Sequence, residues 1–403
     1  MRTYERTHPW LTFDVDLRRA PAKLWIMLGE CQSKCEHISW APLLPETQKR
    51  LHQLYLAKGS LATTAIEGNT LSEKEVLLHL EKKLKLPPSK KYLAQEVQNI
   101  VDACNEILAK VETGEELHLS SEGTEAFNRQ ALRDLELDND VMPGEIRRHS
   151  VGVSRYKAPP HKDCDFLLAK LCDWLNGPTF APAGSTRIVS AVIKAVLAHL
   201  YLAWIHPFGD GNGRTARLVE FQILISSGVP APAAHLLSNH YNLTRTEYYR
   251  QLDKASRSGG DVVSFLLYGV QGFLDGLRNQ LDELRSQQWQ VVWRDYVWRS
   301  FRERRSPSDE RRRQLVFALS RSADPVPLSK LDELDPRLTK AYAGRTSKTL
   351  SRDVNALVSM GLVVKSKGKV RARKEAILGF LPVGTTAHET WREVMGEGDR
   401  EKE

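Results

Sequence analysis

The feature that most constrains this chain is a glycine-rich bend between two long apolar stretches. Ser185–Trp204 and Gly213–Ser226 are apolar with helical periodicity, and His206–Arg217 between them reads HPFGDGNGRTAR. Glycines at alternate positions allow the backbone to turn sharply and to approach a ligand closely. The second helix begins inside the bend, so its unpaired amides face whatever the bend holds. The pattern predicts two buried helices joined at an anion-binding loop.

The polar side chains of the bend fit phosphoryl-type chemistry. Arg214 and Arg217 supply fixed positive charge for phosphate oxygens. Asp210 is a hard oxygen ligand suited to a Mg²⁺ ion shared with those phosphates. His206 can be neutral at cellular pH and accept the proton of an attacking hydroxyl, and Asn212 can donate to a phosphate oxygen. A glycine-rich run of this kind also occurs in plain surface turns, and it lacks the Gly-Lys-Ser/Thr of a Walker loop.

Most of the remaining chain also has helical periodicity. It covers residues 47–65, 72–84 and 92–108, and Ser72 with Glu75 form a capping-box pattern. We expect a mainly α fold in five parts. They are an N-terminal helical region (1–110), a core domain (111–278), a polar helical connector (279–309), a small basic domain (310–381) and a disordered tail (382–403).

The block over residues 310–381 has the element order of a winged helix-turn-helix domain. Helices are predicted at 314–319, 328–334 and 347–360, and a hairpin at 362–372 encloses a basic turn. The third helix is polar and basic on one face and apolar on the other. This layout is typical of DNA contact, but such domains also bind proteins, and the sequence leaves both open.

The composition is that of an ordinary globular protein. Hydrophobic residues make up 41% of the chain and charged residues 27%, with a net charge of +8. Residues 1–10 lack the apolar core of a signal peptide. The apolar stretch 188–205 contains Lys194 and His199, which favours a buried helix over a membrane span. We therefore expect a cytoplasmic protein without membrane contact, and five cysteines as reduced thiols.

The bend resembles the signature of a known family. His206–Arg217 matches the Fic-domain motif HPFx[DE]GNGRxxR at every specified position, and Pro143–Arg147 and Glu247–Tyr249 resemble neighbouring Fic segments. The resemblance covers roughly residues 51–277. It implies a Fic-type helical core with a short β-hairpin flap and the activity of a protein adenylyltransferase. Such an enzyme transfers AMP from ATP to a Ser, Thr or Tyr hydroxyl of a target protein. Family members often pair, which makes a homodimer a further hypothesis.

The resemblance also implies roles for single residues. His206 would deprotonate the target hydroxyl, Asp210 would hold Mg²⁺, and Arg217 would pair with the γ-phosphate of ATP. The flap would border the ATP site and align the target peptide by strand addition, and Tyr248 would lie near the adenine. The implied ATP-binding set is Val151, Gly152, Val153, Gly211, Asn212, Gly213, Arg214, Arg217 and Tyr248.

A second motif upstream suggests a built-in brake. Thr63–Gly68 reads TTAIEG and matches the inhibitory pattern [ST]xxxE[GN] of the N-terminally self-inhibited Fic class. Glu67 can pair with Arg217, and ATP would then lose an anchor.

The sequence leaves other readings of these motifs open. Glu67 could simply cap a helix end. The chain could also remove AMP with Glu67 positioning water, use another phosphate donor, or act as a DNA-binding regulator that senses nucleotide. The intact His206 and Asp210 favour an enzyme over a sensor, because a pure binding site needs neither a base nor a metal ligand.

Overall fold

The structure is a computed structural model that describes residues 2–153, 156–181, 184, 186–322 and 324–378. The chain divides into two compact units, residues 1–281 and 282–403. The N-terminal region and the predicted core domain therefore belong to one unit with one hydrophobic core. The tail predicted to be disordered (382–403) lies outside the described residues.

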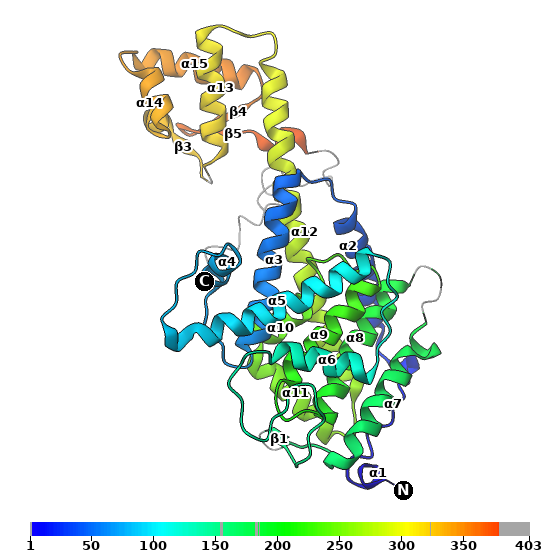
Figure 1. The fold of residues 1–403 in the computed structure, drawn as a ribbon. Helices are drawn as coiled ribbons and strands as arrows, with labels where there is room; N and C mark the ends of the chain where they lie inside the picture. The colour runs from blue at the N-terminus through cyan, green and yellow to red at the C-terminus, as the bar shows by residue number, and fades with distance from the viewer. Residues whose placement is uncertain (1, 154–155, 182–183, 185, 323, 379–403) are drawn as a thin grey trace. The chain divides into compact units, whose positions relative to one another are not determined.

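Helices make up most of the first unit (Figure 1). In chain order they are α1 (Thr3–Thr7), α2 (Ala22–Ser39), α3 (Pro45–Ala65), α4 (Glu73–Leu80), α5 (Lys91–Glu112), α6 (Ser121–Ala131), α7 (Cys164–Asn176), α8 (Arg187–Ile205), α9 (Asn212–Ser226), α10 (Leu236–Leu243), α11 (Arg245–Arg257) and the first half of α12 (Val262–Ser300). The strands β1 (Gly152–Val153) and β2 (Tyr156–Lys157) form a short antiparallel hairpin, the predicted flap.

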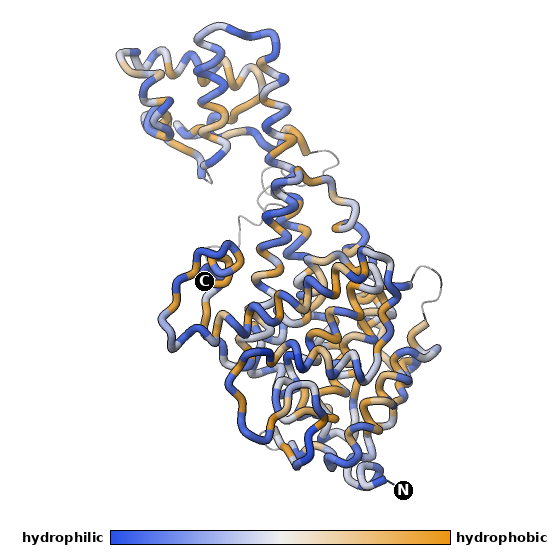
Figure 2. The backbone as a smooth tube through the Cα atoms, in the orientation of Figure 1, coloured by the Kyte–Doolittle hydropathy of each residue, from blue (hydrophilic) through white to orange (hydrophobic). Residues whose placement is uncertain are grey.

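Helix α8 is the central helix of this unit. It packs against α9, α7 and α2, and Figure 2 shows the apolar colouring of the helices around it. Among the described residues it is the one helix long and apolar enough to cross a membrane by length and composition, yet 78% of that stretch is buried inside the fold. In this fold α8 is thus a core helix, as the sequence predicted. All five cysteines are buried and unpaired.

Local sequence signals explain most helix ends. Ser72 accepts a hydrogen bond from the Glu75 backbone, and the Glu75 carboxylate accepts one from the Ser72 backbone, as the capping box predicted. Helix α4 ends at Leu80, earlier than expected, because Lys82 adopts a positive φ of 59°. The predicted connector helix is not a separate element. It is the continuation of α12, which runs unbroken from Val262 because no proline interrupts it.

The second unit combines the second half of α12 and further helices with a small sheet. It contains α13 (Pro307–Ser320), α14 (Pro336–Tyr342), α15 (Ser347–Ser359), β3 (Val326–Pro327), β4 (Val363–Ser366) and β5 (Lys369–Ala372). The sheet is antiparallel with the order β3-β5-β4. The second helix was predicted too early. Residues 328–333 form a 3₁₀ helix instead, and α14 begins at Pro336 because Asp335 caps it by accepting from the Arg337 backbone.

Candidate active site

The glycine-rich bend is built by two residues with positive φ. Helix α8 ends at His206, which has φ 48° and whose backbone N–H donates to the Leu202 carbonyl at 2.9 Å. Gly211, with φ 75°, directly precedes α9. A histidine in the left-handed region costs on the order of 1 kcal/mol and persists only where its surroundings fix it. The bend thus turns the chain from one buried helix into the next.

Two asparagines hold the bend in shape. The Asn212 side chain accepts from the Phe208 N–H at 2.9 Å and donates to the Phe208 carbonyl at 2.8 Å. Asn128, fully buried on α6, donates to the Asp210 carbonyl at 2.9 Å and accepts from the Gly144 N–H at 2.9 Å. The Asn212 amide was expected to donate to phosphate. In the structure it is instead committed to the bend, and its backbone N–H is the donor at the start of α9.

Glu67 lies at the glycine-rich bend, where the sequence predicted an anion site. This part of the bend, at the start of α9, is called the anion cradle. Glu67 Oε1 accepts from Arg217 Nη2 at 2.5 Å, and the same nitrogen donates to the Thr63 carbonyl at 2.9 Å. A Cβ atom at position 213 would collide with Glu67 Oε1, so the carboxylate is pressed against the backbone at the start of α9. The pairing predicted from the TTAIEG motif is therefore present. The carboxylate takes the place that a phosphate would take at a helix N-terminus.

Electrostatics favour this pair in its charged form. Burial alone would raise the pKa of Glu67, but the charge and hydrogen bond of Arg217 outweigh it and lower the pKa below its ordinary value. Burial likewise works to lower the pKa of Arg217, and the Glu67 charge outweighs it. The Arg217 side chain is 1% exposed, and its Nε and Nη1 atoms are buried without an acceptor among the described residues. Unpaired buried donors of this kind can hold an anionic ligand.

The other arginine of the bend is held by two carboxylates. Arg214 pairs with Asp210 at 3.0 Å and with Glu96 at 3.3 Å. Burial raises the pKa of Glu96, and hydrogen bonding from Asn69 and the charge of Arg214 offset this only in part. Asp210 is half exposed and also accepts from the Gly211 N–H at 2.6 Å. Arg214 and Asp210 therefore meet at the open side of the cradle.

His206 has the protonation state that a general base requires. Burial lowers its pKa to about 4, and the Ala203 carbonyl and the nearby carboxylates only partly oppose this. The positive charge of Arg147 lowers the pKa further. The imidazole is therefore neutral at cellular pH and can accept a proton.

A cavity of about 770 Å³ lies at the glycine-rich bend. His206, Asp210 and Glu67 lie in its wall together with Tyr248 and the flap residue Tyr156. Val151, Gly152, Arg214 and Arg217 are not among the residues that line this cavity, and their predicted contacts with nucleotide stay predictions. The cavity lining also includes Gly211, Asn212 and Gly213.

A cluster of buried polar side chains lies next to Tyr248. Its hydroxyl lies 2.8 Å from His199 Nε2, and His199 Nδ1 lies 3.1 Å from the Glu220 carboxylate. Tyr241 donates to the other Glu220 oxygen at 2.9 Å. All four side chains are buried. The wall around Tyr248 is thus fixed by polar contacts within the core.

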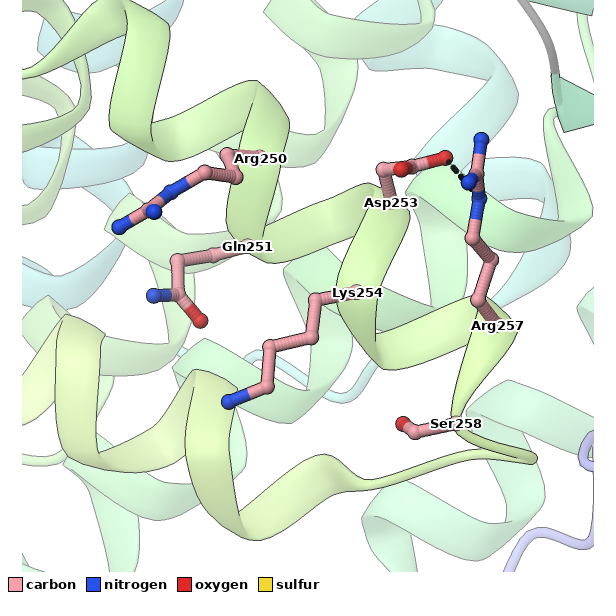
Figure 3. Close-up of a pocket in the computed structure, with 6 residues that line it drawn as sticks. All are labelled: Arg250, Gln251, Asp253, Lys254, Arg257 and Ser258. Atoms are coloured by element: carbon pink, nitrogen blue, oxygen red, sulfur yellow. Dashed lines mark ion pairs between the residues drawn. The ribbon is translucent and has the colours of Figure 1, made fainter.

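A second, open hollow lies next to this cavity and is lined by residues of α11 and by Ser258. Figure 3 shows Arg250, Gln251 and Lys254 on one side of that hollow and the Asp253–Arg257 ion pair on the other. Arg250, Asp253 and Arg257 line both spaces. This part of the cavity is therefore bordered by charged residues.

A Mg²⁺ ion shared with phosphates fits this site. Such an ion needs one or two protein carboxylates besides the substrate oxygens. Asp210 is a half-exposed carboxylate on the cavity wall. In the described part of the chain, no group of three or more His, Cys, Asp or Glu side chains is arranged to hold a metal ion by itself. The donor set suits an ion that arrives with a nucleotide.

Several site residues carried no recognisable sequence signal. Asn128, Glu96 and His199 lie on other helices and reach the site only through the fold. Arg147 belongs to a segment that resembled the family, yet its side-chain contacts were not predicted.

Comparisons with known proteins agree with this geometry. Residues 118–224, which hold α6 to most of α9, match the family model "Fic/DOC family". A crystal structure of a Fic family protein from Desulfovibrio desulfuricans G20 aligns with a TM-score of 0.53 and 19% identity, covering 89% of this chain and 98% of that one. The structure of Fic-1 (residues 134 to 508) from Caenorhabditis elegans aligns with a TM-score of 0.52 and 25% identity, covering 66% and 74%.

The chain is also similar in sequence to proteins named as protein adenylyltransferases. Protein adenylyltransferase fic-1 of Caenorhabditis briggsae is 26% identical over 67% of this chain and 49% of its own length. Its counterpart in Caenorhabditis elegans is 27% identical over 65% and 49%. Residues 118–224 thus match the Fic/DOC family, and the chain is related to proteins named protein adenylyltransferase Fic. It spans about half the length of the relatives that it matches.

Proposed function

We propose that this protein transfers AMP from ATP to a hydroxyl side chain of a target protein and that Glu67 restrains the reaction. The observation that carries the proposal is the Glu67 carboxylate on Arg217 at 2.5 Å, in the anion cradle next to a neutral His206. An anion site with a base beside it is the arrangement that phosphoryl-type transfer needs. The relatives that carry the adenylyltransferase name support the choice of AMP.

The chemistry follows from the residues of the bend. His206 takes the proton of the acceptor hydroxyl, and that oxygen forms a bond to the α-phosphorus of ATP. The bond between the α-phosphorus and the bridging oxygen breaks, and pyrophosphate leaves. Arg214 and the amides at the start of α9 balance the negative charge. Asp210 would hold a Mg²⁺ ion, which when bound neutralises charge on the phosphates.

The restraint works by competition for one guanidinium. While Arg217 pairs with Glu67, it cannot bind the terminal phosphate in full. ATP then lacks the anchor that aligns its α-phosphate with His206. Displacement of the Glu67 carboxylate completes the site.

The direct test is incorporation of labelled AMP by the wild type and by Glu67→Gly and His206→Ala variants. We expect more incorporation by Glu67→Gly, and none once His206→Ala is added. Equal incorporation by wild type and Glu67→Gly would contradict the brake. Release of AMP from the labelled protein by the wild type, but not by Glu67→Gly, would assign the chain to AMP removal instead.

We also propose that the second unit contacts the phosphates of duplex DNA. Two groups of its cations differ in their partners. Those on α13 and next to it pair with carboxylates, for instance Arg311 and Arg312 with the buried Asp353 on α15. Those on α15 and on the β4–β5 hairpin are exposed and make no ion pair with any described residue: Lys348, Arg352, Lys365, Lys367 and Lys369. Unpaired cations on a helix and an adjacent hairpin suit a phosphate backbone.

The test is binding of the full chain to duplex DNA at two salt concentrations. We expect affinity at low salt that falls steeply with added salt. Replacing Lys365, Lys367 and Lys369 by Gln should weaken binding and flatten the salt dependence, by roughly 0.9 in log-log slope per lost contact. Arg321→Gln, which removes a cation already paired with Asp335, is the control. No binding at low salt would favour a protein-contact module.

A further inference from the structure

One buried arginine, Arg147, contacts both the flap and His206, the proposed general base. Arg147 is 4% exposed and follows the turn that packs against the glycine-rich bend. Its backbone N–H donates to the Pro207 carbonyl at 2.9 Å, and Ile146 forms an isolated antiparallel bridge with Phe208. The residue therefore enters the site on a segment already paired to the bend.

Its guanidinium donates to three backbone carbonyls at once. Nε donates to His206 at 2.7 Å, Nη1 to His149 at 2.7 Å, and Nη2 to Pro159 at 2.6 Å. His149 precedes the β1–β2 hairpin, and Pro159 follows it. Both ends of the flap and the residue that carries the base are thus fixed to one rigid, planar group.

The contact with His206 stabilises an unfavourable backbone. His206 has φ 48°, a conformation that a side chain other than glycine adopts reluctantly. Its N–H is bound to Leu202 and its carbonyl to Arg147, so both polar groups of this residue are held. The imidazole direction follows from that backbone.

The charge of Arg147 stays next to the base. Among the described residues no carboxylate pairs with this guanidinium, which donates to backbone carbonyls. Burial lowers the pKa of Arg147 from its ordinary value, but this remains a guanidinium and stays charged. A fixed positive charge beside His206 disfavours its protonation, consistent with its lowered pKa.

We propose that Arg147 is a positioning residue that sets the flap and His206 relative to each other. The proposal rests on the proposed AMP transfer, since it assigns Arg147 a role in aligning the acceptor on the flap with the base. The flap has further anchors, because the Tyr156 hydroxyl donates to the Trp204 carbonyl at 2.7 Å and His8 Nε2 lies 2.8 Å from the Lys157 carbonyl. Loss of Arg147 should therefore loosen the flap ends without unfolding the hairpin.

The experiment compares Arg147→Lys and Arg147→Met in the Glu67→Gly background, with Arg148→Met as the matched control. Arg148 is the next residue, has an 89% exposed side chain and pairs with Glu145 at 3.4 Å. Lysine keeps the charge without the planar fork, and methionine loses both. The readouts are hydrogen exchange of residues 149–159, MgATP binding by calorimetry, self-labelling with AMP, and its pH profile.

We expect Arg147→Lys to exchange flap amides roughly 10-fold faster. Its self-labelling rate should fall on the order of 10- to 100-fold, with MgATP affinity changed by less than about threefold. Arg147→Met should in addition move the acidic limb of the pH profile upward, which a merely structural role would not do. Arg148→Met should match the parent in every measurement.

Two results would overturn the proposal. One is Arg147→Lys behaving like Arg148→Met in both flap exchange and labelling. The other is loss of MgATP binding in parallel with labelling, which indicates general disruption of the site. If the Glu67→Gly parent itself labels nothing, the proposed AMP transfer fails. Flap exchange and MgATP binding still decide whether Arg147 fixes the flap.

Discussion

Removing the Glu67 carboxylate should raise AMP transfer by an amount that the ion pair predicts. Oε1 of Glu67 and Nη2 of Arg217 are 2.5 Å apart, which puts the charge centres about 4 Å apart and gives about 4 kcal/mol at an effective dielectric constant near 20. The Glu67 side chain is 31% exposed, so solvent screening leaves about 2–3 kcal/mol. With about 1.4 kcal/mol per factor of ten, kcat/KM for ATP should rise roughly 30- to 160-fold in Glu67→Gly.

The assay is the initial rate of labelled AMP incorporation at ATP concentrations below KM, paired with calorimetric MgATP affinity. Glu67→Gln keeps the length of the side chain and loses its charge, so it should reproduce most of the increase. Glu81→Gly, at an exposed position after α4, is the control and should leave the rate unchanged. A large increase in Glu67→Gly with none in Glu67→Gln would refute the electrostatic reasoning and leave a steric block. A rate within twofold of wild type in both would refute the brake.

Three further predictions test the base and the bend. In Glu67→Gly, AMP transfer should stay constant from neutral pH to about pH 5 and fall as pH approaches 4. The reason is that the lowered pKa of about 4 keeps His206 neutral above that pH. A midpoint near 6.5 in the pH–rate profile would contradict this. Gly211→Ala should lower stability to thermal unfolding by about 1–3 kcal/mol, since φ is 75° and a Cβ would meet Asn128 Nδ2 at 3.0 Å; an unchanged melting temperature would show that the bend tolerates a side chain. Asn128→Ala should cost about 2–4 kcal/mol through its lost hydrogen bonds to the bend, whereas the exposed Asn105→Ala should cost almost nothing.

The sequence predicted what depends on local pattern. The apolar periodicity before and after the bend corresponds to α8 and α9, and the TTAIEG motif led to the Glu67–Arg217 pair. The apolar periodicity is a local sequence property that determines helical conformation. The TTAIEG motif is a short segment that identifies the charged residue. A pairing between one glutamate and one arginine can be foreseen when each belongs to its own recognisable motif.

Contacts that depend on the fold were not predictable in this way. Asn128 reaches the bend across 82 positions and Arg147 reaches His206 across 59. Nothing in the periodicity around either residue distinguishes a buried clamp from an exposed polar side chain. The continuous α12 was missed for a related reason. Its composition changes from apolar to polar near residue 279. A change of composition alone does not end a helix that no proline interrupts.

Glu67 occupies only part of the hydrogen-bonding capacity of the arginines at this site. Glu67 satisfies Nη2 of Arg217, while Nε and Nη1 stay buried without an acceptor, and Nε of Arg214 is in the same state among the described residues. A carboxylate held at the end of α3 offers only one contact to this guanidinium, whereas a phosphate group carries three oxygens and arrives with its own freedom to orient. A ligand that accepts hydrogen bonds from more of these buried N–H groups binds with a more favourable free energy. We therefore expect the brake to act as a competition whose strength falls as ATP concentration rises, because no described residue closes the cavity against nucleotide.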